Sequence, residues 1–261
     1  MAELAFIQAF LEDNLAYARD KFRSRTELTV TSKRDANDLL TEVDLTLQKR
    51  AIEAIEKRFP GDRIVSEEGD YAVLPKSPYG RCWVMDPIDG TNNFVRGLFP
   101  IFAVSLAFSV EGRAASVGVL LPGTGDLFLA KRGKGAFLNG KRLHVSTVNG
   151  LGEARVDFDF SLIAEREEML TRAREVFLRA GQVRCYGSAV ASICQIATGD
   201  TDGYLHMSLS PWDYAASQLI VEEAGGAASR LDGSTLQLFD GRKGVLITNG
   251  AVHQEVLGLL R

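Results

Sequence analysis

Two carboxylates stand three residues apart behind an apolar stretch, in the run Trp83-Val84-Met85-Asp86-Pro87-Ile88-Asp89-Gly90-Thr91. The apolar residues predict a buried strand that ends just before Asp86, so this carboxylate would lie at the end of the strand. Pro87 fixes the backbone, so the Ile88 carbonyl and the Asp89 side chain can converge on the same point. Three oxygen donors from one tight turn suit a hard cation such as Mg2+.

The next two residues add a second kind of ligand. We expect Gly90 and Thr91 to open a helix, where free N–H groups attract a phosphate. A metal and a phosphate in one turn indicate metal-assisted phosphoryl chemistry. An ordinary turn is the alternative, since Asp-Pro and Asp-Gly pairs are common turn formers. An EF-hand fits poorly because Ile88 stands at the third loop position.

Other carboxylates could complete such a site. Glu67 and Glu68 end a short predicted strand, where neighbours point to opposite faces, so at most one of them enters the site. Asp213 opens an apolar helix, where a carboxylate is also favourable without any ligand. A cleft that gathered four carboxylates would need divalent cations to offset their repulsion: Glu67, Asp86, Asp89 and Asp213.

The chain resembles the inositol monophosphatase family, the Mg2+-dependent, lithium-sensitive sugar-phosphate phosphatases. Residues Asp86–Thr91 resemble the first motif of this family. The second motif resembles Trp212-Asp213-Tyr214-Ala215-Ala216 with the later Gly225-Gly226. Shorter matches are Ser66-Glu67-Glu68-Gly69, Lys33 with Asp38–Asp44, and Gly187-Ser188-Ala189. These matches follow the family order from about residue 30 to residue 250.

The resemblance implies a set of roles. Two Mg2+ ions would be held by Glu67, Asp86, the Ile88 carbonyl, Asp89 and Asp213. Phosphate would lie across them against the amides of Gly90 and Thr91. The catalytic groups would be Glu67, Asp86 and Thr91, with direct in-line attack by water and no phosphoenzyme.

Three further assignments concern the surroundings. Asp44 resembles a residue that holds the waters of a weaker third ion, and a plain helix-start carboxylate is the alternative. Lys33 could reach metal-bound water or phosphate, and a solvated lysine is its alternative. The leaving-group side would be lined by Gly187, Ser188, Ala189 and His206, the last at a position where inositol-using relatives typically carry an acid.

The leading hypothesis is therefore a Mg2+-dependent phosphomonoesterase for a small polyol or sugar phosphate, with inositol-1-monophosphate first. The family also makes histidinol phosphate, fructose 1,6-bisphosphate and adenosine bisphosphates alternative substrates. A regulatory binding protein in transcription or ribosome assembly is the alternative from another class. The resemblance implies a homodimer.

Composition limits the partners and the compartment. The formal net charge of −4 over 261 residues provides no broad basic field for nucleic acid. No apolar run reaches the ~18 residues of a membrane span, and the first ten residues lack a basic signal region. The three cysteines show no CxxC spacing, so we expect reduced thiols in a cytoplasmic protein.

These residues need elements to position them. Apolar positions at helical spacing predict helices over 3–24 and 43–59, followed by strands at 63–66, 81–85, 102–110, 114–121, 126–131 and 135–138. Beyond residue 149 the pattern alternates, with strands at 154–160, 183–186, 203–205, 227–229 and 245–248 and helices at 166–180, 188–198, 212–224 and from 252.

We therefore expect a mixed α+β and α/β fold in two halves. Residues 1–148 would form an α+β half carrying the metal-binding motif, and residues 149–261 an α/β half that completes the site. The site would lie in a cleft between them. The resemblance implies a layered α-β-α-β-α sandwich.

Overall fold

The computed structural model describes residues 2–33, 38–76, 80–97, 99–160 and 163–260. Two long helices open the chain, α1 (Ala2–Arg23) and α2 (Glu42–Arg58), and both confirm the predicted helices. Between them lie the 3-10 turn η1 (Arg25–Glu27) and an antiparallel strand pair, β1 (Val30–Ser32) with β2 (Leu39–Thr41), which the sequence patterns did not predict. These strands are too short to carry a clear alternation.

A seven-stranded sheet follows, in the order β3-β4-β5-β6-β7-β8-β9. Its strands are β3 (Arg63–Ser66), β4 (Arg81–Asp89), β5 (Ala103–Val110), β6 (Arg113–Leu121), β7 (Asp126–Lys131), β8 (Gly135–Leu138) and β9 (Lys141–Arg142). β3 runs parallel to β4, and the remaining neighbours are antiparallel. The 3-10 turn η2 (Gly69–Tyr71) precedes β4, and the short helix α3 (Thr91–Arg96) follows it.

β4 is longer than predicted, and this matters for the site. Instead of ending before Asp86 it continues to Asp89, with a break in its pairing to β5 between these two residues. Pro87 lies within the break, where the missing N–H costs no ladder hydrogen bond. The break lets two carboxylates of one strand face the same point.

The second sheet has the order β11-β10-β12-β14-β13. Its strands are β10 (Arg155–Phe158), β11 (Gln182–Arg184), β12 (Gly203–Leu209), β13 (Ala227–Ser229) and β14 (Lys243–Thr248). Its helices are α4 (Arg166–Arg172), α5 (Arg174–Arg179), α6 (Ala189–Thr198), α7 (Pro211–Glu223) and α8 (His253–Leu259), with the turns η3 (Leu151–Glu153) and η4 (Ile163–Glu165).

Two elements of this sheet layer differ most from the prediction, and β10, β11 and β14 differ at their ends by one or two residues. The helix predicted over 166–180 is broken at Ala173, a fully buried residue whose backbone leaves the helical region. β12 extends four residues beyond its predicted end at Leu205 and reaches Leu209. Polar His206 and Ser208 interrupt its apolar pattern, yet the strand continues because it pairs with β14.

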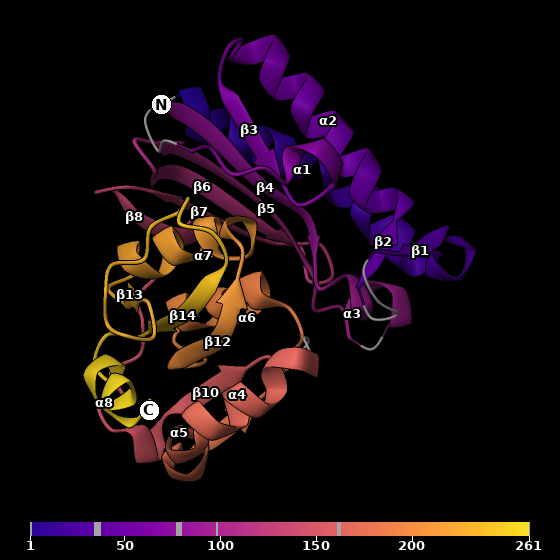
Figure 1. The fold of residues 1–261 in the computed structure, drawn as a ribbon. Coiled ribbons are helices and arrows are strands. Elements are labelled where there is room, and N and C mark those ends of the chain that lie inside the picture. The colour runs from indigo at the N-terminus through magenta and orange to yellow at the C-terminus, as the bar shows by residue number, and fades with distance from the viewer. Residues whose placement is uncertain (1, 34–37, 77–79, 98, 161–162, 261) are drawn as a thin grey trace.

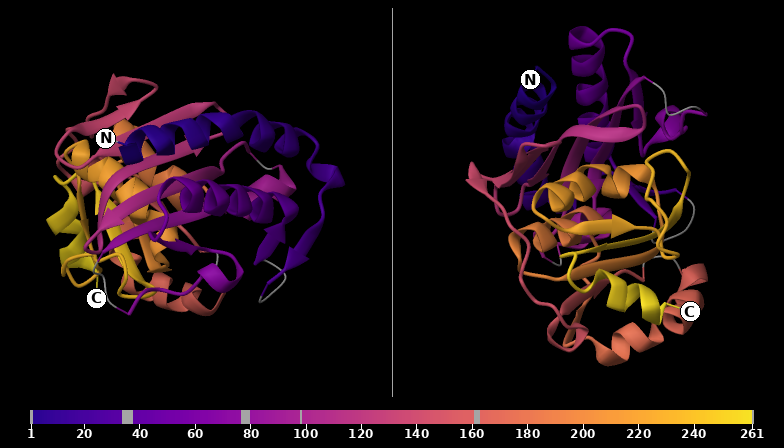
Figure 2. Two further views of the ribbon diagram at one scale, coloured as in Figure 1. Left: turned by 90° about the horizontal axis from the view of Figure 1, so that it is seen from above. Right: turned by 90° about the vertical axis from the view of Figure 1, so that its left-hand side faces the viewer.

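The elements form five layers, as Figure 1 shows from top to bottom. α1 and α2 cover one face of the seven-stranded sheet, α6 and α7 fill the space between the two sheets, and α4, α5 and α8 cover the far face of the second sheet. The views of Figure 2 show the same stacking. The expected α-β-α-β-α sandwich is therefore confirmed.

The central apolar cluster joins the halves. It contains Val84 and Val117 of the first sheet, Ile193 of α6, Leu219 of α7 and Val245 of the second sheet. Helices of residues 149–261 thus pack on the sheet of residues 1–148, and the division at residue 148 stays a prediction. Within the described part of the chain, no helix is both long and apolar enough to cross a membrane.

Candidate active site

A cavity of about 510 Å³ opens where β4 meets the N-terminal ends of α3, α6 and α7. Both halves of the chain line it, as expected for a cleft between them. The predicted site residues on its wall are Lys33, Glu67, Asp86, Ile88, Asp89, Gly90, Thr91, Gly187, Ala189, His206 and Asp213. Its size is within the usual range for small-molecule sites.

Three carboxylates meet in this cavity. Each of Asp86, Asp89 and Asp213 offers an oxygen, and these three oxygens lie within 4.8 Å of one another. Asp86 is 1% exposed, and its Oδ1 accepts no hydrogen bond from the described residues. Burial, followed by the charges of Glu67 and the other two acids, raises the pKa of Asp86 well above its usual range. An orphaned, buried acceptor among clustered carboxylates fits a divalent cation.

Asp89 is held by the start of α6. Its oxygens accept hydrogen bonds from the amides of Ala189 (3.2 Å) and Val190 (3.0 Å) and from the Ser188 hydroxyl. Burial raises the pKa of Asp89 to about 7, although the bonds from Ser188 and Val190 work in the opposite direction. Ser188 is itself 1% exposed and caps α6, so its contacts are to Asp89 and the helix and not to the cavity.

Asp213 lies in the first turn of α7. The N-cap is Ser210, Pro211 follows at the first helical position, and Asp213 Oδ2 accepts the Ser210 amide at 2.7 Å. Burial and the nearby charges of Glu67 and Asp89 raise the pKa of Asp213 well above its usual range. The capping role and the place in the acidic cluster, which the sequence posed as alternatives, are therefore combined in one residue.

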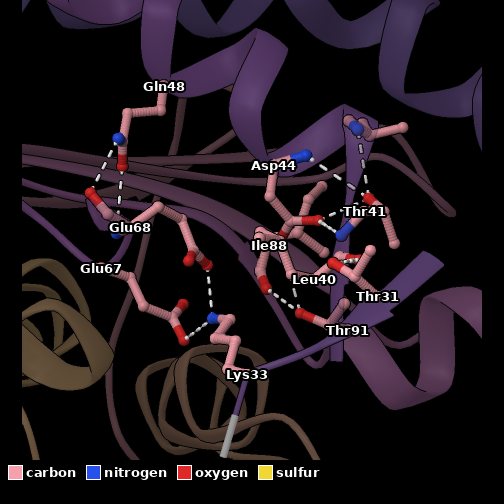
Figure 3. Close-up of polar contacts among 11 residues, drawn as sticks. Thr31, Lys33, Leu40, Thr41, Asp44, Gln48, Glu67, Glu68, Ile88 and Thr91 are labelled. Atoms are coloured by element: carbon pink, nitrogen blue, oxygen red, sulfur yellow. Dashed lines mark hydrogen bonds and ion pairs between the residues drawn. The ribbon is translucent and has the colours of Figure 1, made fainter. Parts of the chain in front are cut away.

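Lys33 bridges the adjacent glutamates (Figure 3). Its Nζ lies 2.7 Å from Glu67 Oε1 and 2.5 Å from Glu68 Oε1. Glu68 is 3% exposed, and burial raises its pKa to about 7. Lys33 is thus not a solvated lysine and Glu68 does not face solvent. Strand alternation is not the reason for their different positions, because β3 ends at Ser66, before both glutamates. Of the two, Glu67 lines the cavity and Glu68 does not, as expected.

Thr91 joins the turn at the end of β4 to α2. Its Oγ1 donates to the Ile88 carbonyl at 2.9 Å and lies 3.5 Å from Asp44 Oδ1. Asp44 is fully buried, and its Oδ2 accepts from the Thr41 amide (2.9 Å) and hydroxyl (2.5 Å) in a capping box at the start of α2. Asp44 is therefore a helix-start carboxylate, as one alternative expected, and also a neighbour of Thr91.

The backbone conformation at position 90 and the side chain next to it both require a glycine there. Its φ is +84°, and a Cβ there would lie 3.0 Å from the Ser188 side chain. A side chain would therefore be strained and would press on the group that holds Asp89.

His206 is positioned by a contact that the sequence does not reveal. It lies inside β12, is 4% exposed, and its Nδ1 accepts the Ser208 amide at 2.9 Å. Burial lowers the pKa of His206 to about 4, so the ring is neutral near pH 7. With Nδ1 as the acceptor, the ring proton resides on Nε2.

Two charged residues on the wall were missed by sequence reasoning, Asp159 and Arg242. Arg242 Nε donates to Ser208 Oγ at 2.8 Å and Nη2 donates to the Ser208 carbonyl at 3.0 Å. No motif surrounds Arg242, so only the fold could reveal it. Asp159 directly follows β10, and a carboxylate at a strand end was the signal that could have identified it.

The layered sandwich and its cavity with three clustered carboxylates define a protein with a candidate divalent-cation site between two sheets. Comparison with known proteins is more specific: the family model described as Inositol monophosphatase family matches residues 5–261. The chain belongs to the inositol monophosphatase family, which is Mg2+-dependent.

Individual relatives cover most of the chain. It is 36% identical over 235 residues to the fructose-1,6-bisphosphatase/inositol-1-monophosphatase of Thermotoga maritima, covering 87% of this chain and 84% of that protein. It is 37% identical over 219 residues to the Nus factor SuhB of Pseudomonas aeruginosa, with 82% and 80% covered. A solved IMPase/NADP phosphatase complexed with Mg2+ and phosphate matches with a TM-score of 0.84 and 25% identity, covering 98% and 95%.

Proposed function

We propose that this protein is a Mg2+-dependent phosphomonoesterase for small polyol or sugar phosphates, with inositol-1-monophosphate first, acting through direct attack by water. The observation that carries this proposal is the buried Asp86 Oδ1, which has no donor among the described residues and lies beside Asp89 and Asp213. The solved relative that holds Mg2+ and phosphate supports it.

The residues that would hold the metal are the acidic cluster and its neighbours. Asp86, Asp89 and Asp213 would bind two Mg2+ together with Glu67 and the Ile88 carbonyl, and Asp44 would face a weaker third ion. Mg2+, when bound, supplies activation of a water and neutralisation of the leaving oxygen. Glu67 Oε1 accepts from Lys33, and the second oxygen of this carboxylate could bind the cation.

The protein's own groups would orient the water and the substrate. Thr91 Oγ1 donates its proton to the Ile88 carbonyl, so its lone pairs are directed to accept from the attacking water. Glu67 accepts from the same water, which aligns it for in-line attack. The amides of Gly90 and Thr91 would hold the phosphate, and Gly187, Ala189 and His206 would border the leaving group.

Phosphate release tests the proposal. The panel is inositol-1-phosphate, histidinol phosphate, fructose 1,6-bisphosphate and an adenosine bisphosphate, each with millimolar Mg2+ and with EDTA. We expect turnover that needs Mg2+ and is inhibited by lithium, with inositol-1-phosphate as the best substrate. Full turnover in EDTA would exclude the metal mechanism, and a strong preference for another substrate would replace the proposed one.

A second candidate function comes from the SuhB relatives. Because a relative named Nus factor SuhB is 37% identical, we also propose a binding role in transcription or ribosome assembly. A pulldown with the wild type and with Asp86→Asn separates the two functions. A partner retained by the inactive variant would support the binding role, and a partner lost with activity would contradict it.

The remaining expectations concern assembly and location. We propose a cytoplasmic homodimer without nucleic-acid binding of its own, consistent with the net charge of −4. Light scattering after gel filtration measures the assembly state, and a monomeric mass at micromolar concentration would exclude the dimer.

A further inference from the structure

The acids of the cluster reach the cavity from both halves of the chain. Asp86 and Asp89 stand at the end of β4, whereas Asp213 lies in the first turn of α7. Ionised carboxylates whose oxygens lie within 4.8 Å of one another repel. The apolar cluster packs α6 and α7 between the two sheets (Figure 1), but apolar contacts are not directional. Polar contacts must therefore set where the ends of these helices lie relative to β4.

One such contact links β5 to the start of α7. Ser105 of β5 is the register partner of Asp86 and is 1% exposed. Its Oγ donates to the Trp212 carbonyl at 3.3 Å. Trp212 directly precedes Asp213. A single hydroxyl thus connects the strand position beside one acid to the residue before another.

The opposite end of α7 is attached separately. Glu223, the last residue of α7, accepts the amides of Gly133 (2.6 Å) and Gly135 (2.7 Å) with its two carboxylate oxygens. These glycines lie where β7 turns into β8. Loss of the Ser105 contact would therefore release only the end of α7 that carries Asp213.

Asn93 makes the corresponding link to α6. It lies in α3, directly beyond the turn at the end of β4, and is 8% exposed. Its Nδ2 donates to the Ile101 carbonyl at 2.9 Å and to the Tyr186 carbonyl at 2.7 Å. Tyr186 stands two residues before Ser188, which caps α6 and donates to Asp89. Displacement of this segment would move the groups that hold Asp89.

We propose that Ser105 and Asn93 are positioning residues, which hold α7 and α6 so that the three acids lie at the spacing that Mg2+ needs; this inference rests on the proposed metal-dependent function. Neither residue is on the cavity wall, so each acts through the helix that it holds. Mg2+ demands near-ideal octahedral geometry, and a small displacement of Asp213 or Asp89 therefore lowers the affinity for the ion.

Direct binding of Mg2+ to the whole chain tests this role. Calorimetry gives the Kd, and thermal melts across Mg2+ concentrations give the stabilisation that the ion provides. In Ser105→Ala, we expect the Kd for Mg2+ to rise about fivefold, as for the loss of one hydrogen bond. The rise of the melting temperature at a given Mg2+ concentration should shrink accordingly.

Ser109→Ala is the matched control. Ser109 lies on the same strand, is fully buried and donates to the Cys82 carbonyl at 2.9 Å within the sheet. This variant should lower the melting temperature in EDTA about as much as Ser105→Ala does, but keep the wild-type Kd. An unchanged Kd in Ser105→Ala would overturn the proposal. An equal rise of the Kd in Ser109→Ala would also overturn it, because general loosening of the sheet would then be the cause.

Asn93→Ala has a control of its own. We expect it to raise the Kd on the order of tenfold, a common cost of removing a group that orients metal ligands. Asn249→Ala removes a similarly buried amide, which lies outside the cavity wall and whose Nδ2 donates to the Val148 carbonyl at 2.8 Å. It should keep the wild-type Kd. If Asn93→Ala does not fold, the two serine variants decide the inference.

Hydrolysis of p-nitrophenyl phosphate and inositol-1-phosphate separates this inference from the proposed function. If the wild type binds Mg2+ and the variants change its Kd as expected, but no phosphate is released, only the phosphomonoesterase function fails. If the wild type releases phosphate with Mg2+ and Ser105→Ala binds the ion as well as Ser109→Ala does, only the positioning inference fails.

Discussion

At the scale of single residues, Asp213 allows catalysis to be separated from folding. In Asp213→Asn, the amide oxygen can still accept the Ser210 amide, while one charge leaves a cluster that repels itself. We expect kcat to fall on the order of 10²–10³-fold, the usual cost of removing an electrostatic stabiliser. The melting temperature in EDTA should stay the same or rise slightly. Half of the wild-type turnover in this variant would mean that Asp213 only caps α7.

Thr91 is the second residue whose role can be isolated. Thr91→Ala removes the hydroxyl that contacts Ile88 and Asp44 but leaves the backbone amides. We expect kcat to fall by up to ~10²-fold, because the attacking water loses its alignment. The Mg2+ concentration for half-maximal activity should change little, and Thr91→Ser should restore most of the rate. Equal losses of rate and Mg2+ affinity would indicate a structural role.

At the scale of elements, α2 holds the loop that carries the two glutamates. Gln48 Nε2 donates to the Glu68 carbonyl at 3.0 Å, and Gln48 Oε1 accepts the Glu68 amide at 3.1 Å. These two bonds tie the segment after β3 to the helix, as Figure 3 shows. The carboxylates next to Lys33 therefore depend on α2 for their position.

Gln48→Ala would remove this tie. Two buried backbone groups would lose their partners, which we expect to cost about 1–3 kcal/mol of unfolding free energy. The Mg2+ concentration for half-maximal activity should rise, because Glu67 is less well placed. Gln8→Ala is the control, since Gln8 is exposed and bonds only Glu12 within α1 among the contacts described. If both variants had the same Mg2+ requirement, the tie would be irrelevant to the metal site.

At the scale of the whole molecule, the fold buries acids whose ionised forms its own contacts stabilise only in part. The pKa of Glu68 and that of Asp89 are each raised to about 7, and those of Asp86 and Asp213 lie well above their usual range. Burial is the first cause in each case. The folded protein therefore holds more protons than the unfolded chain near neutral pH.

This difference predicts how stability depends on pH. A carboxyl with a raised folded pKa lowers the unfolding free energy as pH rises toward that pKa. His206, whose pKa is lowered to about 4, acts in the opposite sense only below its unfolded value near 6.5. From pH 6.5 to pH 8 we thus expect the metal-free protein to lose on the order of 1–3 kcal/mol.

Thermal melts in EDTA and in millimolar Mg2+ test this expectation. The loss at pH 8 should be reversed by Mg2+, which binds the ionised carboxylates of the folded state and stabilises it by mass action. Asp86→Asn should reduce both the pH dependence and the response to Mg2+. A melting temperature in EDTA that rises from pH 6.5 to pH 8 would contradict the expectation.

The sequence by itself determined the features that depend on near neighbours. The regular spacing of apolar residues predicted α1, α2 and most strands to within a few residues. A helix or strand that buries one face must carry apolar residues at its own repeat, so the spacing identifies the element. The order of the layers came from the family resemblance. Asp86, Asp89 and the Thr91 contact with Ile88 lie within one short turn, so their convergence could be read from the chain.

Only the tertiary structure decided which distant groups face one another. Asp159, His206 and Arg242 come from three separate segments, and parallel pairing of β10 with β12 and the path of the chain before β14 bring them to one wall. The direction of Ser188 toward Asp89 depends on how α6 meets β4. Such contacts are set by packing between elements, and they cannot be predicted from the spacing of residues along the chain.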